Sequence, residues 1–157
     1  MVEINIPGRG LIKIKNLLLD YNGTIACDGK VIPSVKEKIE AINKKGIRVQ
    51  LVTADTHGTA SSQCVNMPIE IQVFDNSNAA ENKREIAEKL GAEQCICIGN
   101  GFNDGQMFEA CGISIIVIGE EGCSAKSLLK ADIVCKNIEE AFDLILKPNR
   151  IIATLRG

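Results

Sequence analysis

The stretch LLLDYNGTIA, residues 17–26, decides the fold, because it joins an apolar run to a carboxylate and a turn. Residues 17–19 are three leucines, a pattern typical of a parallel strand that is covered on both faces. Asp20 follows them directly, and the Asn-Gly pair at 22–23 favours a tight turn. We therefore expect a buried strand that presents the Asp20 side chain at its carboxyl end.

Apolar strands followed by polar turns recur on both sides of this stretch. Downstream, the apolar periodicity predicts strands at 47–52, 69–74, 95–98, 113–118 and 133–135. Helical spacing predicts helices at 35–46, 57–65, 78–90, 104–111, 124–129 and 138–146, the first of them capped by Ser34. Upstream, alternation predicts a hairpin of strands 2–6 and 11–15, and residues 151–155 are expected to add an edge strand.

Strands that alternate with helices of this length require right-handed crossovers and a mostly parallel sheet. No low-complexity linker or internal repeat interrupts the pattern. The sequence therefore predicts a single α/β domain over residues 1–157. We expect a Rossmann-like three-layer sandwich around a mostly parallel central sheet, preceded by an N-terminal β-hairpin.

The composition excludes several classes of function. Apolar residues make up 45% of the chain and charged residues 24%, which is ordinary for a soluble globular protein. The net charge is −2 and lysines and arginines do not cluster, so a nucleic-acid surface is not expected. No apolar run could span a bilayer and no signal peptide is apparent, which predicts a cytoplasmic protein without a membrane partner.

The seven cysteines lack the spacing of a zinc site, and the single histidine, His57, cannot complete one. Cys95 and Cys97 alternate within a predicted strand, so both side chains point to one face. We expect buried, reduced thiols, with Cys27 used for packing and His57 at the rim of the site.

Four of the expected strands end in polar or glycine-rich segments. They are followed by Asp20, by residues 53–55, by residues 75–76 and by residues 99–104. In a parallel sheet, ligands bind beyond the carboxyl ends of the strands, near the switch in strand order. The polar groups of these segments are therefore expected to converge on one rim.

The residue types at this rim suit one kind of chemistry. Asp20 and Asp104 supply carboxylates, Thr53 a hydroxyl and Lys83 a cation, a set that fits Mg²⁺-assisted handling of a phosphoryl group. Taken singly, each has a structural explanation: an aspartate beside glycine caps turns, and a lysine among charged neighbours belongs to a solvated face. Taken together at successive strand ends, they favour a functional site.

These residues, in this order, resemble the four motifs of the haloacid dehalogenase superfamily. The motifs are DYNGT at 20–24, Thr53, Lys83 and GNGFND at 99–104, and the resemblance covers nearly the whole chain. The sequence from the fourth motif through ADIV at 131–134 is similar to the phosphorylation domain of P-type ATPases. The chain thus resembles a soluble, P-type-ATPase-like member of the superfamily.

The resemblance implies a Mg²⁺-dependent hydrolase of phosphoric monoesters or acyl phosphates that forms an aspartyl phosphate on Asp20. The catalytic residues would be Asp20, Thr53 and Lys83. The metal ligands would be Asp20, Asn22, Asn100 and Asp104. The substrate, a small phosphorylated molecule, would be held by Asn22, Gly23, Thr24, Thr53, Ala54, Lys83 and Asn103. The short segments 26–33 and 53–78 leave no room for a cap domain, and such an open site is compatible with a homo-oligomer.

Two asparagines depart from the superfamily pattern. Asn22 stands where its phosphatases carry a general acid, whose contribution is typically about 10²–10⁴ in rate. Asn100 stands where a metal-binding aspartate is usual, and an amide oxygen carries no charge. The sequence therefore predicts a slow enzyme or one that favours good leaving groups. The alternative is a catalytically impaired regulatory module that binds phosphate or a metal.

Overall fold

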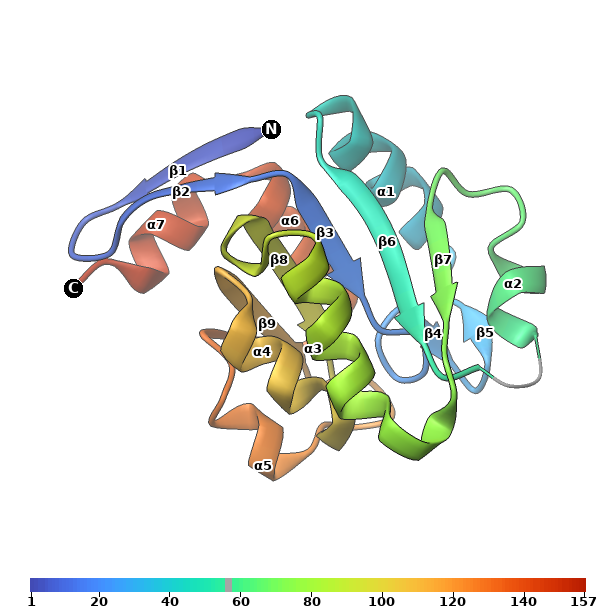
Figure 1. Cartoon of the computed structure of the whole chain (residues 1–157). Helices are drawn as coiled ribbons and strands as arrows, with labels where there is room; N and C mark the ends of the chain where they lie inside the picture. The colour runs from blue at the N-terminus through green and yellow to red at the C-terminus, as the bar shows by residue number, and fades with distance from the viewer. Residues whose placement is uncertain (56–57) are drawn as a thin grey trace.

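The computed structural model describes residues 1–55 and 58–157. A six-stranded sheet lies at its centre in the order β10-β9-β8-β3-β6-β7, with every neighbouring pair parallel (Figure 1). Its strands are β3 (Asn16–Leu19), β6 (Arg48–Thr53), β7 (Glu70–Val73), β8 (Cys95–Gly99), β9 (Ile113–Val117) and β10 (Ile133–Cys135). The predicted α/β architecture is confirmed, and β3 takes a central place.

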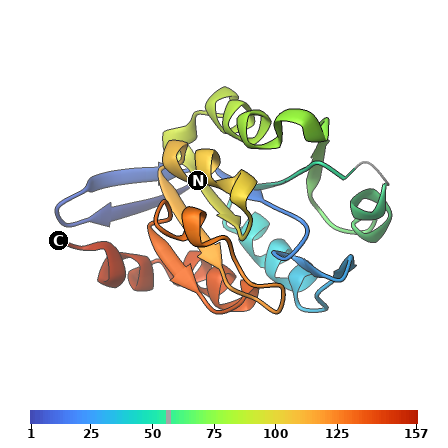
Figure 2. The same cartoon turned by 90° about the horizontal axis from the view of Figure 1, so that it is seen from below.

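Helices cover both faces of the sheet. One face packs against α1 (Val35–Lys44) and α6 (Ile138–Leu146), and the other against α3 (Ala79–Lys89) and α4 (Gly105–Ala110). Figure 2 shows α3 and α1 on opposite sides of the strands. The remaining described helices are α2 (Thr59–Gln63), α5 (Ala125–Leu128), α7 (Asn149–Leu155) and the short 3-10 turns η1 (Asn76–Asn78), η2 (Ala92–Gln94) and η3 (Phe102–Asp104).

The leucine run of β3 shows why this strand is central. Leu17 and Leu19 belong to the core on the α1 and α6 side, whereas Leu18 belongs to the core on the α3 and α4 side. All three side chains are fully buried. Cys95 and Cys97 also share one face, as predicted, and the seven cysteines are free thiols. The described residues contain no helix long and apolar enough to cross a membrane.

Two hairpins flank the sheet. The predicted N-terminal one pairs β1 (Val2–Ile6) with β2 (Gly10–Ile14) and extends from the body of the molecule (Figure 1). The second pairs β4 (Ala26–Cys27) with β5 (Lys30–Val31) and was not predicted, because two-residue strands carry no periodicity. Its turn residues, Asp28 and Gly29, have positive φ angles of 50° and 75°. An Asp-Gly pair of this kind was the available signal.

The expected edge strand at 151–155 is wrong, because these residues form the helix α7. The two consecutive isoleucines suggested a strand, but Ile151 and Leu155, four positions apart, are the buried pair. That spacing places them on one helix face, which packs near β1. Pro148 precedes the helix, where a missing N–H does no harm.

Two smaller expectations also changed. Ser34 stands at the start of α1, but its hydroxyl makes no cap and donates to the Glu139 carboxylate at 2.7 Å. The predicted helix at 57–65 starts at a position outside the described residues, and the structure has α2 over Thr59–Gln63. Neither change alters the order of the layers.

The helical assignment of α7 is testable by its periodicity. Ile151→Ala removes a fully buried side chain and is expected to lower the free energy of unfolding by about 2–5 kcal/mol. Ala153→Lys changes an exposed residue and should shift it by less than about 0.5 kcal/mol. In an edge strand, residue 153 would share the face of 151, so a large loss for both variants in urea unfolding would contradict the helix.

Candidate active site

The site lies where β3, β6 and β8 end side by side. Strands β3 and β8 pair in register, and the Asp20 N–H extends that ladder by donating to the Ile98 carbonyl at 3.0 Å. Asp20 is thereby fixed beside the loop at 99–104. On the other side of β3, strand β6 ends at the buried Thr53. The sheet order therefore brings these strand ends together, as predicted.

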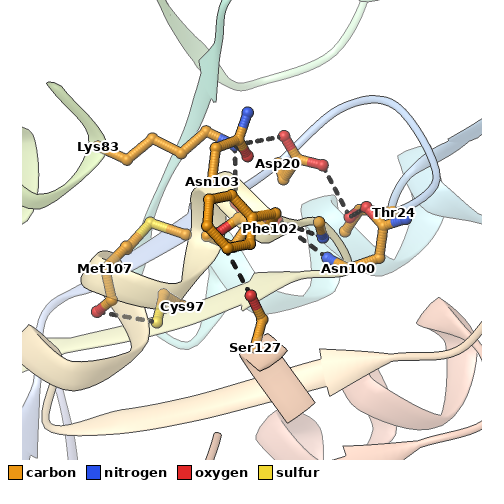
Figure 3. A network of polar contacts seen from close by, with 11 residues as sticks. Asp20, Thr24, Lys83, Cys97, Asn100, Phe102, Asn103, Met107 and Ser127 are labelled. Carbon is orange, nitrogen blue, oxygen red and sulfur yellow. Dashed lines mark hydrogen bonds and ion pairs between the residues drawn. The ribbon is translucent and has the colours of Figure 1, made fainter. Parts of the chain in front are cut away.

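Lys83 is the centre of the polar network (Figure 3). It comes from α3, and its side chain is only 1% exposed. Its ammonium donates to Asp20 Oδ1 at 2.6 Å, to Asp104 Oδ1 at 2.7 Å and to Asn103 Oδ1 at 3.0 Å. These three acceptors match the three protons of an ammonium group. Lys83 thus ties β3 to the loop at 99–104.

The charges of this network do not cancel. Burial alone lowers the pKa of Lys83, but the adjacent Asp20 and Asp104 carboxylates outweigh it and hold that pKa above its usual value. Burial, followed by the charge of Asp20, raises the pKa of Asp104 to about 6 against the pull of Lys83. Two carboxylates around one ammonium leave an excess of negative charge near neutral pH.

Asp104 is more completely buried than the Asp20 carboxylate. Its side chain is fully buried, and its Oδ2 accepts the backbone N–H groups of Asn100 at 3.0 Å and Gly101 at 2.8 Å. A side chain at Gly99 would collide with this carboxylate. Lys83 contacts the other oxygen, Oδ1. Both oxygens of Asp104 are thus hydrogen-bonded within the protein and hold the loop at 99–104 in place. The role of Asp104 as a metal ligand stays a prediction.

Thr24 and Asn100 connect Asp20 to a more distant loop. The Thr24 hydroxyl is 3.1 Å from Asp20 Oδ2 and 3.2 Å from Asn100 Oδ1, so its single proton serves either acceptor. The Asn100 amide donates to the Gly122 carbonyl at 3.0 Å. An aspartate at position 100 could not make that last bond. The asparagine therefore has a structural use at this position.

A cavity of about 430 Å³ opens over these groups. It is lined by Asp20, Asn22, Thr53, Ala54, Asn76, Lys83, Asn100, Gly101, Phe102 and Asn103. The structure thus brings together most of the predicted residues. Gly23 and Thr24 line a neighbouring cavity of about 720 Å³, and His57 lies outside the described residues.

Three lining residues, Asn76, Gly101 and Phe102, were not assigned a role from the sequence. Each lies in a segment that was predicted to reach the rim, after β7 and after β8, and that position was the available signal. Over residues 1–55 and 58–157, no group of three or more histidines, cysteines or acids is placed to hold a metal ion. A cation here would therefore depend partly on amide and backbone oxygens.

Comparisons with known proteins agree with this geometry. A family model described as haloacid dehalogenase-like hydrolase matches residues 6–112. An uncharacterised protein of Methanocaldococcus jannaschii is 44% identical over 78 residues, which cover 47% of this chain and 84% of the relative.

Solved structures with a similar fold include a phosphatase with phosphate bound. The 3-deoxy-D-manno-octulosonate 8-phosphate phosphatase of Moraxella catarrhalis, solved with magnesium and phosphate ions, has a TM-score of 0.71 at 18% identity. The match covers 91% of this chain and 94% of that one. A putative hydrolase from Legionella pneumophila has a TM-score of 0.74 at 16% identity, covering 92% and 88%. At these identities the likeness concerns the fold.

The burial of Asp104 predicts a pH dependence of stability without metal. A carboxyl whose folded pKa is raised takes up protons on folding, so its contribution is present at low pH and is lost as pH rises from about 4 to about 6. Asp104→Asn removes this group. Across that interval, the wild type should lose about 1–3 kcal/mol more unfolding free energy than the variant, measured by urea unfolding in EDTA.

Asp143 provides a control of opposite sign. Its pKa is lowered to about 2, chiefly by hydrogen bonds from Lys38 and Lys147, so its contribution is lost only as pH falls below about 4. Asp143→Asn should differ from the wild type by a nearly constant amount between pH 5 and 7. If the unfolding free energies of Asp104→Asn and the wild type also differed by a constant amount, the raised pKa of Asp104 would be contradicted.

Proposed function

We propose that this chain, which belongs to the haloacid dehalogenase-like hydrolases, hydrolyses phosphoric monoesters or acyl phosphates through a covalent intermediate on Asp20. The observation that carries the proposal is the placement of the Asp20 carboxylate. It is held by the Lys83 ammonium at 2.6 Å and lines a cavity to which Thr53 contributes a hydroxyl and four asparagines contribute amides. A fixed carboxylate beside a buried cation is suited to attack a phosphorus atom and to hold the phosphoryl oxygens.

The reaction would proceed in two steps. An oxygen of Asp20 attacks phosphorus, the bond to the leaving group breaks, and an aspartyl phosphate forms. Water then attacks the phosphorus of that intermediate, which releases inorganic phosphate and regenerates the Asp20 carboxylate. Lys83 and the end of β6 at Thr53 and Ala54 would hold the phosphoryl oxygens, because these groups line the same cavity.

The oxygen donors around Asp20 fit a hard divalent cation such as Mg²⁺. The Asp20 carboxylate, the main-chain carbonyl of Asn22 and the side-chain oxygen of Asn100 would hold it, since all three residues line the cavity. When bound, the ion supplies positive charge that neutralises the phosphoryl oxygens. With a single carboxylate among these donors, its affinity should be low.

The leaving group decides the rate in this site. The Asn22 side chain is exposed at the cavity, and an amide does not ionise near neutral pH, so it cannot act as a general acid. A leaving group that departs as a stable anion needs no such acid. We therefore propose acyl phosphates, or esters of acidic alcohols, as the preferred substrates.

Loss of Asp20 tests the proposal directly. Asp20→Asn keeps the shape of the side chain but removes the nucleophile, so Mg²⁺-dependent release of phosphate from acetyl phosphate should fall to background. Asp28→Asn, an exposed change in the β4–β5 turn, is the matched control and should keep full activity. Wild-type release that equals that of Asp20→Asn would favour instead a module that binds phosphate without turning it over.

Restoring an acid at position 22 tests the leaving-group argument. Asn22→Asp should raise kcat/KM for glycerol phosphate, whose alkoxide leaving group needs a proton, by about 10² or more. For acetyl phosphate the rise should be smaller by at least tenfold. Equal gains on both substrates, or none on glycerol phosphate, would show that the amide at 22 does not limit the reaction.

A further inference from the structure

Phe102 stands at the mouth of the cavity with its ring in solvent. The residue is 67% exposed, although it lines the same cavity as Asp20 and Lys83. Its backbone is held in place, because the Phe102 carbonyl accepts the Ser127 hydroxyl at 3.3 Å (Figure 3). The next residue along, Asn103, contacts Lys83. The ring is therefore anchored one residue from the charged network.

This exposure is unusual for an aromatic residue of this chain. The sequence has one tyrosine and four phenylalanines. Tyr21, Phe108 and Phe142 are buried, and Phe74 is half-buried and packs against the core. Phe102 alone among these five side chains is mostly exposed, and it lies at the site rather than elsewhere on the surface.

A lysine side chain lies over the Phe102 ring. Lys126, an exposed residue of α5, places its Nζ 5.9 Å from the centre of the Phe102 ring. Among the described residues, no carboxylate forms an ion pair with Lys126. An exposed ring with an ammonium over it that makes no ion pair suits a planar group that carries negative charge.

We propose that Phe102 and Lys126 bind the leaving group of the substrate, and that this group is a planar aromatic anion such as a phenolate or an aryl carboxylate. The inference rests on the proposed function and deepens it. Such a group departs as a stabilised anion, which is what a site without an acid at Asn22 requires. Phe102 would stack on the ring, and Lys126 would attract the charge that develops as the bond to phosphorus breaks.

The first test compares a substrate whose leaving group is aromatic with one whose leaving group is not. The measured quantity is the ratio of kcat/KM for p-nitrophenyl phosphate to kcat/KM for acetyl phosphate. Stacking on one aromatic side chain is typically worth about 1–3 kcal/mol, so Phe102→Ala should lower the ratio about fivefold or more. Phe102→Trp keeps a π face and should hold the ratio within about twofold of the wild type.

Leu129→Ala is the matched control, because Leu129 is 89% exposed just after α5 and does not line the cavity over Asp20. Its ratio should equal that of the wild type. A ratio that Phe102→Ala leaves unchanged, or that Phe102→Trp lowers as far as Phe102→Ala does, would overturn the proposal.

The second test needs no turnover and separates this inference from the proposed function. By calorimetry with Mg²⁺ present, phenylphosphonate should bind the wild type at least fivefold more tightly than methylphosphonate, and Phe102→Ala should abolish that preference. A preference without any hydrolysis would retain the aromatic subsite and reject the enzyme. Equal binding of the two phosphonates by the wild type would reject the subsite, whatever the activity.

Discussion

The contact of the Lys83 ammonium with three oxygens is the interaction on which the rest of the site depends. A buried charge is tolerated only when it is paired and hydrogen-bonded, and here one cation pairs with two carboxylates from different elements. Asp20 comes from the end of β3 and Asp104 from the loop after β8, while Lys83 itself comes from α3. Without the ammonium, the two acids would face each other in a buried environment. The same contact therefore joins α3 to the end of β3 and fixes the Asp20 carboxylate, the nucleophile of the proposed reaction.

Much of this arrangement could be predicted from the sequence, because it follows from where apolar runs stop. The leucines of β3 indicated a strand buried on both faces, and parallel strands bring their carboxyl ends to one edge. The periodicity failed at Ile151 and Ile152, where two isoleucines fit a strand or a helix and only packing against β1 decides. The burial of Asp104 was also beyond prediction, since it depends on how the loop at 99–104 folds back on its own backbone N–H groups.

The two asparagines that depart from the superfamily pattern differ in their surroundings. Asn22 is exposed and lines the cavity, so in the proposed reaction its amide would face the leaving group. Asn100 accepts from Thr24 and donates to Gly122, and so links the loop after β3 to the loop after β9. A carboxylate at position 100 would add negative charge where Asp20 and Asp104 already outnumber Lys83. The structure thus accommodates the amide at 100 by hydrogen bonds on both of its polar atoms.

The Thr24 hydroxyl has two acceptors at nearly equal distance, and this has a consequence for the readiness of Asp20. The hydroxyl hydrogen can point to only one acceptor at a time, so Asp20 Oδ2 has a hydrogen-bonded and a free state. In the proposed reaction, Oδ2 is free to attack phosphorus when the hydrogen points to Asn100. In the proposed reaction, the fraction of molecules in which Oδ2 is free depends on this orientation, and a ligand that binds the Asn100 oxygen would shift that fraction.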